Sequence, residues 1–549
     1  MDSLLRKTAL LLCVLLLSCL AGPAFAEDSA AEFPPIDPAP DFGGKDIWFY
    51  STSYTEDYWA RYDASASHTE EEERLHAYRE NLQAACNARI HEGTRGDWSS
   101  AVSEMIGFSW LGGEEDKLAV FIFSTDLVGS VLSAGAAAPV SCDLSAPYWN
   151  RNVTGLLTLG GKVYGAGTGS SQPAQCLYFN RRVLTDAGVD CGSLYDLQSS
   201  GEWTWGRFEE VLKQVLDSDK TEAAPLCGSQ DDLYQIAVLS AGASFVDTDA
   251  DGRLYPTVSG SAAKAALSWA KDLWKTYSAV RPEGASWNWS DQVWLDGQAA
   301  FRIGKAYQGF STVGFEGMRD EWGCLAFPAK DSGGVYLSDS TGLAALIPAC
   351  YDTETADKLM QLYGLWTAPA VSDTASDDLL SLFPGATDSR AVNETYAMLA
   401  DPAHQVIQKT GLVGGTNNFL GALLWGLESS DPDSLISMCM PLWIETCSRL
   451  AENIEDRSFR VIFPDTITPW TEPAVLIRPD ENTASFALFV QQDGETVWEA
   501  ENALPGRNAV PNSAFSKGGD FVIVCRALDA GGNEAGTFTM IYSGLMPME

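Results

Sequence analysis

Side chains that could carry out chemistry are plentiful in this chain, but few of them stand at a spacing that catalysis requires. The 549 residues include 74 acidic residues and four histidines, which lie in polar and unpatterned surroundings. There is no Gly-x-Ser-x-Gly elbow, no phosphate-cradling Gly-x-x-x-x-Gly-Lys-Ser/Thr loop and no His-Glu-x-x-His pair. Carboxylate pairs that could hydrolyse a glycoside are inevitable among so many acids, and a solvated surface is the favoured interpretation of any one pair. The sequence therefore predicts a protein that is not an enzyme, with a hydrolase as the minor alternative.

One stretch has the carboxylate spacing of a metal-binding loop. In Asp247-Thr248-Asp249-Ala250-Asp251-Gly252, carboxylates alternate before a glycine, as at the start of a calcium loop. Val258 stands where such a loop needs a bidentate glutamate, and Arg253 adds a positive charge. No cysteine–histidine cluster has zinc spacing either. A turn is thus the favoured interpretation, and we expect no metal and no cofactor.

The middle of the chain carries an ordered series of short motifs. They are Gly161-Lys162-Val163-Tyr164-Gly165, Leu177-Tyr178-Phe179-Asn180-Arg181-Arg182, Leu184-Thr185-Asp186-Ala187-Gly188-Val189, Trp203-Thr204-Trp205-Gly206-Arg207-Phe208 and Trp294-Leu295-Asp296-Gly297-Gln298-Ala299-Ala300-Phe301. In this order and spacing, residues 45–455 resemble the extracellular solute-binding proteins of bacterial ABC importers, the maltose-binding-like family. The resemblance implies a two-lobe periplasmic-binding-protein-like α/β fold of type II, whose lobes close around a ligand by a hinge motion. It also implies capture of a carbohydrate or oligosaccharide and delivery to ABC transporter permease subunits.

The same resemblance places candidate ligand-binding residues at the edges of the lobes. Sugars stack their apolar faces on aromatic rings and present hydroxyl groups to planar polar partners. The residues carried over are Ser53, Tyr54, Phe123, Asp126, Gln172, Asp232, Tyr234, Tyr307 and Asn417. Some have a structural alternative: Phe123 as a core residue, Asp126 as a helix cap, and Asp232 as an acid favoured by the dipole of a helix N-terminus.

The elements that must position these residues follow from alternating strands and helices. Residues 46–50 and 119–123 read as strands that end in polar turns, and helical spacing of apolar residues predicts helices over 204–216 and 261–277. This alternation indicates α/β lobes with largely parallel sheets, in which ligands bind beyond the carboxyl ends of strands. The expected first lobe is 45–170 with 335–375, and the expected second lobe is 171–334 with 376–456.

The C-terminal part, residues 460–549, has a different pattern. Short apolar runs such as 486–490 and 521–524 are separated by turn residues, which predicts a small all-β sandwich, immunoglobulin-like or fibronectin-like. This unit is not part of the solute-binding family. A surface sensor or adhesion protein that reuses the fold, with the sandwich as its interaction module, therefore stays open as the alternative function.

The N-terminal residues and the net charge limit where the protein is located and which partners it can have. Residues 1–26 read as an export signal, with a cleavage site at Ala24-Phe25-Ala26, and the Pro-rich residues 27–44 read as a linker. A lipoprotein-type signal ending in Cys19 is the rival interpretation, although simple cleavage is favoured. The net charge of −39 disfavours nucleic acid as a partner. We expect an exported protein, extracellular, at the cell surface or periplasmic, that meets a membrane only through a permease or a lipid on Cys19.

Overall fold

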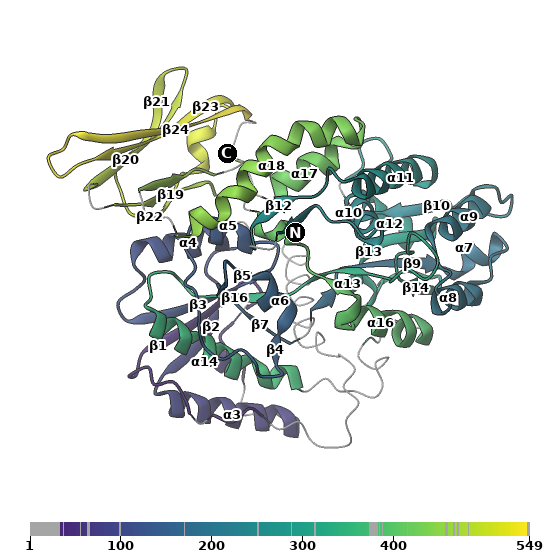
Figure 1. The fold of residues 1–549 in the computed structure, drawn as a ribbon, viewed down its shortest axis with the longest axis horizontal. Helices are drawn as coiled ribbons and strands as arrows, with labels where there is room; N and C mark the ends of the chain where they lie inside the picture. The colour runs from purple at the N-terminus through teal and green to yellow at the C-terminus, as the bar shows by residue number, and fades with distance from the viewer. Residues whose placement is uncertain are drawn as a thin grey trace.

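The computed structural model describes residues 33–545, except for residues 37, 55, 63–65, 98–99, 170, 250–251, 287, 312–313, 373–382, 384, 387, 414–415, 456–458, 465–466, 469–471 and 481–482. The predicted export signal, with Cys19, lies outside the described residues. The described part forms two α/β lobes and a C-terminal all-β unit, which confirms the predicted fold class (Figure 1). In that part, no helix is both long and apolar enough to cross a membrane.

The first lobe is built on a four-stranded sheet in the order β16-β3-β1-β2. Three of its strands run parallel, and β16 joins antiparallel to β3. The strands are β1 (Asp46–Ser51), β2 (Arg89–Gly93), β3 (Lys117–Ser124) and β16 (Leu343–Leu346). The apolar runs predicted as strands at 46–50 and 119–123 are therefore β1 and β3.

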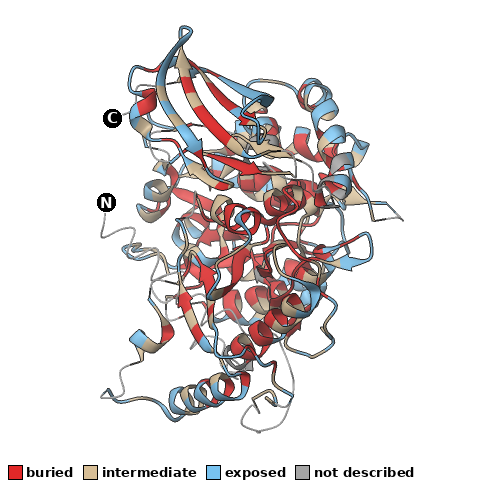
Figure 2. Cartoon of the chain, turned by 90° about the vertical axis from the view of Figure 1, so that its left-hand side faces the viewer, coloured by how far each residue is buried: buried red, intermediate tan, exposed pale blue. Residues whose placement is uncertain are grey.

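Helices cover both faces of this sheet, because β3 is apolar on both sides. Ile122 packs with α3 and α14 on one face, whereas Phe121 packs with α4 and α5 on the other. These helices are α3 (Glu70–Cys86), α4 (Ala101–Leu111), α5 (Val128–Ser133) and α14 (Thr353–Ser372). Figure 2 shows buried residues along the strands and exposed residues along the outer side of the helices.

The second lobe has a mixed sheet in the order β10-β13-β9-β14. β10 and β13 run parallel, but β9 runs antiparallel to both of its neighbours, so this sheet is less parallel than the sequence predicted. The strands are β9 (Gln175–Asn180), β10 (Ala224–Gly228), β13 (Ala299–Lys305) and β14 (Trp322–Leu325). The predicted helices are found as α9 (Trp205–Leu216), capped by Thr204, and α11 (Ser261–Tyr277).

Three short strands lie between the lobes and pair with one another. β8 (Gln172–Pro173), β15 (Ser338–Thr341) and β17 (Gln405–Val406) form a sheet in the order β17-β15-β8. β8 directly precedes β9 of the second lobe, and β15 connects β14 of the second lobe to β16 of the first. Such crossing segments are where two lobes can pivot, because a few backbone dihedrals absorb the motion.

The C-terminal unit follows two helices, α17 (Thr416–Gly426) and α18 (Pro432–Glu455), and consists of two sheets around their own core. One sheet has the order β18-β19-β22 and the other β21-β20-β23-β24. The strands are β18 (Arg460–Ile462), β19 (Ala474–Arg478), β20 (Ser485–Gln492), β21 (Glu495–Ala503), β22 (Gly506–Ala509), β23 (Gly519–Leu528) and β24 (Glu534–Leu545).

This unit packs directly against the first lobe. β19 and β22 contact α4, as the placement of the yellow sheets above α4 in Figure 1 shows. The guanidinium of Arg478 lies 5.2 Å from the centre of the Trp110 ring, and its Nη1 donates to the Ala134 carbonyl. A Cβ at Gly107 would lie 2.8 Å from the Arg507 backbone nitrogen, so the two backbones meet where only glycine fits.

The two strands that flank the stretch with calcium-like spacing pair with each other. β11 (Val246–Thr248) pairs antiparallel with β12 (Leu254–Pro256), which confirms the turn interpretation. The Asp247 carboxylate accepts a hydrogen bond from the Lys409 ammonium. This carboxylate therefore already has a cationic partner, the side chain of Lys409.

Candidate functional site

A cavity of about 530 Å³ lies where the two lobes, the crossing strands and α17 meet. Its lining combines side chains from segments far apart in sequence. They include Asp126 in the turn after β3, Asp231 on α10 (Gln230–Ser240), Lys305 at the end of β13, Asp339 on β15, Gln408 after β17 and Trp425 on α17. The cavity is therefore lined from both lobes and from the strands that cross between them.

Lys305 is held at this cavity by an ion pair within the second lobe. Its Nζ lies 2.6 Å from Oδ1 of Asp232, a residue only 5% exposed. Asp232 sits in the first turn of α10, where its backbone N–H donates to Oγ of the N-cap Ser229. Burial lowers the pKa of Lys305, but the Asp232 carboxylate outweighs it and leaves the pKa above its ordinary value. Lys305 thus remains an ammonium.

Asp339 places a carboxyl group on the crossing strand β15. Desolvation raises its pKa to about 7, although the Lys305 ammonium opposes this shift. The Gln408 amide donates to Oδ2 of Asp339 at 3.4 Å. The charge of the cavity therefore changes near neutral pH.

Trp425 presents an aromatic surface at the cavity. Trp425 is 64% exposed, and its Nε1 donates a hydrogen bond to Oδ2 of Asp231 at 2.9 Å. Burial raises the pKa of Asp231, while the bond from the indole opposes the shift. Because the hydrogen bond engages the edge of the ring, the exposed face is available to a ligand.

Two buried polar residues are also part of the lining, Gln175 at the start of β9 and Ser340 on β15. Gln175 is 4% exposed and Ser340 is 1% exposed. Within the described part of the chain, neither Oε1 of Gln175 nor Oγ of Ser340 has a hydrogen-bond partner. Buried polar atoms normally have partners, so these two atoms are unsatisfied in this arrangement of the lobes.

The sequence-predicted residues fall partly at this cavity. Asp126 lines it and is exposed. It does not cap α5, whose N-cap is Leu127. Asp232 lies one contact away, as the partner of Lys305. Gln172 lies on β8, where it pairs with Thr341, and Asn417 lies in the first turn of α17. The structure does not describe the side chains of Gln172 and Asn417.

The other five predicted residues lie away from the lining. Phe123 and Tyr234 are buried in the core, as the structural alternative for Phe123 anticipated. Ser53 is buried in the turn after β1, and Tyr54 packs against the core between the first-lobe sheet, α3 and α14. Tyr307 is 44% exposed on α13 (Ala306–Gly309) but is not part of the cavity surface. Among the predicted residues with described side chains, Asp126 is the one that lines the cavity.

Sequence reasoning missed most of the lining. Lys305 could have been predicted from the sequence, because it is a charged residue at the carboxyl end of an otherwise buried strand. Such a residue lies at the end of the sheet where ligands bind. Asp231 precedes the predicted Asp232, and helical geometry decides which of the two faces the cavity. Asp339 and Trp425 gave no local signal, because their role depends on contacts between distant segments.

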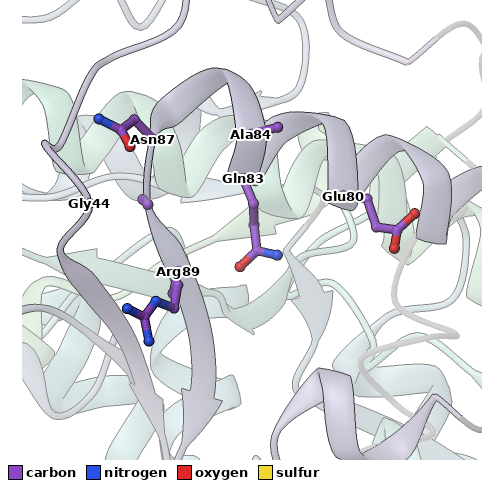
Figure 3. A pocket seen from close by; sticks show the side chains of 7 residues that line it. Gly44, Glu80, Gln83, Ala84, Asn87 and Arg89 are labelled. Carbon is purple, nitrogen blue, oxygen red and sulfur yellow. The ribbon is translucent and has the colours of Figure 1, made fainter.

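A second hollow of about 500 Å³ lies at the C-terminal end of α3, within the first lobe alone (Figure 3). Its polar side chains have structural roles. Oε1 of Gln83 accepts a hydrogen bond from the Ile90 backbone, and Arg89 pairs with Asp46. This hollow is therefore a weaker candidate than the cavity between the lobes.

Comparisons with known proteins give distant structural similarity only. No family model and no curated protein matches the chain. Three solved structures are similar over 73% of this chain: the ABC substrate-binding protein Lmo0181 of Listeria monocytogenes in complex with cycloalternan (12% identity, 98% of that chain, TM-score 0.47), UspC of M. tuberculosis (13%, 99%, 0.49) and the GacH receptor of Streptomyces glaucescens, solved unliganded and with acarbose (15%, 98%, 0.46). Identities of 12–15% with TM-scores below 0.5 are too low to assign a ligand to this chain.

Proposed function

We propose that this protein is an exported solute-binding protein that captures a carbohydrate or oligosaccharide between its lobes and delivers it to an ABC permease. One observation carries the proposal: a cavity of about 530 Å³ at the hinge is lined from both lobes by carboxylates, an amide and an exposed indole. Its volume lies in the range of about 300–1,000 Å³ that is usual for small-molecule sites. Lobes that both contribute to a site can close around its ligand.

The chemistry of the lining suits a sugar. Carboxylate and amide oxygens accept hydrogen bonds from hydroxyl groups, and the face of Trp425 can stack on the apolar face of a pyranose. The polar groups of the lining add specificity, because a ligand that fails to pair them on closure leaves them buried and unsatisfied.

A thermal-shift experiment tests capture. A ligand present at about 100 times its Kd stabilises the folded state by about 2.7 kcal/mol, which raises the melting temperature by several degrees. We expect at least one member of a panel of mono- and oligosaccharides to do so. Trp425→Ala should weaken that ligand about tenfold, whereas Tyr255→Ala, which removes an exposed ring from β12, should not. A panel without any shift contradicts the carbohydrate assignment, and turnover of a glycoside favours the hydrolase alternative.

A surface sensor or adhesion protein is the second candidate. It is favoured by the exposed apolar side chains Val497, Met540 and Ile541 on the outer strands of the C-terminal unit, which suit contact with a partner. Uptake of the labelled sugar separates the two functions. A strain that lacks the protein should lose uptake if it serves an importer and should keep uptake if it is a sensor.

A further inference from the structure

The cavity between the lobes has an unbalanced charge. Asp126, Asp231 and Asp339 contribute three carboxyl groups to its lining. Lys305 is the basic residue among the described lining residues, and it already pairs with Asp232. The lining and the residue paired with it therefore contain four carboxyl groups and one ammonium group.

Hydrogen bonds leave this imbalance in place. Asp231 accepts from the indole of Trp425 and Asp339 accepts from the amide of Gln408, and both donors are neutral. Within the described part of the chain, none of the three lining carboxyl groups forms an ion pair. Burial raises the pKa of Asp231 and of Asp339, as expected for carboxyl groups that lack a sufficient cation.

Two lining residues, Gln175 and Ser340, also have polar atoms without a hydrogen-bond partner among the described residues. Oε1 of Gln175 is an acceptor and has no donor among the described residues, although the residue is buried. Oγ of Ser340 can accept as well as donate. An ammonium group has three donors and no acceptor, so it can donate to the acceptors of the lining while it balances the carboxylates.

We infer that the solute captured between the lobes carries a positive charge, and that it belongs to the class of amino sugars or related ammonium-bearing solutes. The inference rests on the proposed function and narrows its ligand class. The exposed face of Trp425 fits such a ligand, because an indole attracts a cation as well as stacking on a sugar ring.

Three disaccharides with one ring skeleton test the charge directly. Chitobiose, N,N′-diacetylchitobiose and cellobiose differ at the C2 substituent, which is an amine, an acetamide or a hydroxyl. Putrescine supplies ammonium groups without a sugar ring. Isothermal titration at pH 7 with the full chain should show chitobiose binding at least tenfold more tightly than the two neutral disaccharides.

Each outcome has one meaning. Equal or tighter binding of cellobiose overturns the inference and leaves the proposed sugar capture standing. Binding of putrescine but of none of the disaccharides supports the cationic ligand and contradicts the carbohydrate. Binding of none of the four probes overturns the inference for the ligand class that it names, and the wider sugar panel then decides the proposed function separately.

A matched pair of variants tests the residues. The double variant Asp126→Asn/Asp339→Asn keeps the shape of both side chains and removes their charge from the lining. It should reduce the preference for chitobiose over cellobiose about tenfold. Asp219→Asn removes an acidic residue that is exposed in the loop after α9, and it should leave the preference unchanged. An unchanged preference in the double variant would show that these carboxyl groups do not select the ligand.

Discussion

The ion pair with Asp232 fixes the position of the Lys305 side chain at the cavity. The Asp232 carboxylate is nearly buried, whereas its partner is more exposed. Exposed ion pairs contribute little to the free energy of unfolding, whereas breaking a buried pair lowers it strongly. A half-buried pair of this kind should have an intermediate effect. Its removal should therefore have a measurable effect on stability.

Asp232→Asn should lower the free energy of unfolding by roughly 1–3 kcal/mol, because the amide cannot replace a charged acceptor for Lys305. Urea unfolding at pH 7, followed by tryptophan fluorescence, measures the change. The exposed Asp219→Asn variant is the control and should stay within about 0.5 kcal/mol of the parent. Equal stability of the two variants would mean that the ion pair contributes nothing measurable.

Asp339 predicts a pH dependence of stability. The folded state raises the pKa of this carboxyl from 3.8 to about 7. Between about pH 4 and pH 7 the folded state therefore holds a proton that the unfolded chain has released, so the free energy of unfolding falls as the pH rises through this window. Asp339→Asn should flatten that decline, as measured by urea unfolding at pH 5 and pH 8. The same decline in both proteins would exclude Asp339 as its source.

At the scale of elements, Tyr178 on β9 links the second-lobe sheet to the cavity. Its hydroxyl lies 2.9 Å from the Lys305 carbonyl oxygen and 2.8 Å from that of Ala306, and it accepts from the Gly309 N–H at 3.2 Å. The hydroxyl thereby fixes the turn from β13 into α13. Because Lys305 stands at the start of this turn, its position depends on Tyr178.

Tyr178→Phe should weaken ligand binding several-fold and lower the free energy of unfolding by about 1–3 kcal/mol, because the buried Gly309 N–H loses its acceptor. Titration with the ligand and urea unfolding measure the two effects. Tyr78→Phe is the matched control: it removes a buried hydroxyl that donates to the Leu365 carbonyl in the first lobe. The control should lose stability but keep its affinity, and equal affinities of both variants would count against a positioning role for the turn.

Periodicity predicts the elements whose pattern is local. β3 reads as a continuous apolar run, and α9 and α11 show helical spacing because one face of each packs on the second-lobe sheet. The antiparallel orientation of β9 was not predictable in the same way. A strand that enters the lobe from a crossing segment takes its direction from that crossing.

The cavity was less predictable than the sheets. Trp425 and Asp231 are 194 residues apart and meet only when α17 packs beside α10. Asp339 acquires its shifted pKa from burial on a strand of four residues, which has no periodicity to recognise. Asp126 was accessible to sequence reasoning because the turn after a buried parallel strand lies at the ligand-binding edge of a sheet.

At the scale of the whole molecule, the C-terminal unit is part of the first lobe's packing. Nε of Arg507 donates to Oγ of Ser103 across 404 residues, and the guanidinium also lies 3.3 Å from Glu104. Leu476 of β19 is buried in the core that it shares with α4 and α5. The C-terminal unit, which the alternative function treats as an interaction module, is therefore docked on the first lobe through both polar and apolar contacts.

Two glycines on helices of the first lobe test this docking with opposite signs. A Cβ at Gly107 on α4 would lie 2.8 Å from the Arg507 backbone, whereas a Cβ at Gly155 on α6 (Arg151–Leu156) would meet nothing within 4 Å. Alanine is favoured over glycine inside a helix by about 1 kcal/mol, so Gly155→Ala should raise the free energy of unfolding. Gly107→Ala should lower it, because β22 must shift away from α4, and urea unfolding of both variants measures the difference. A gain in stability for both would mean that the C-terminal unit yields at this contact without loss, and that it is not joined tightly to the first lobe.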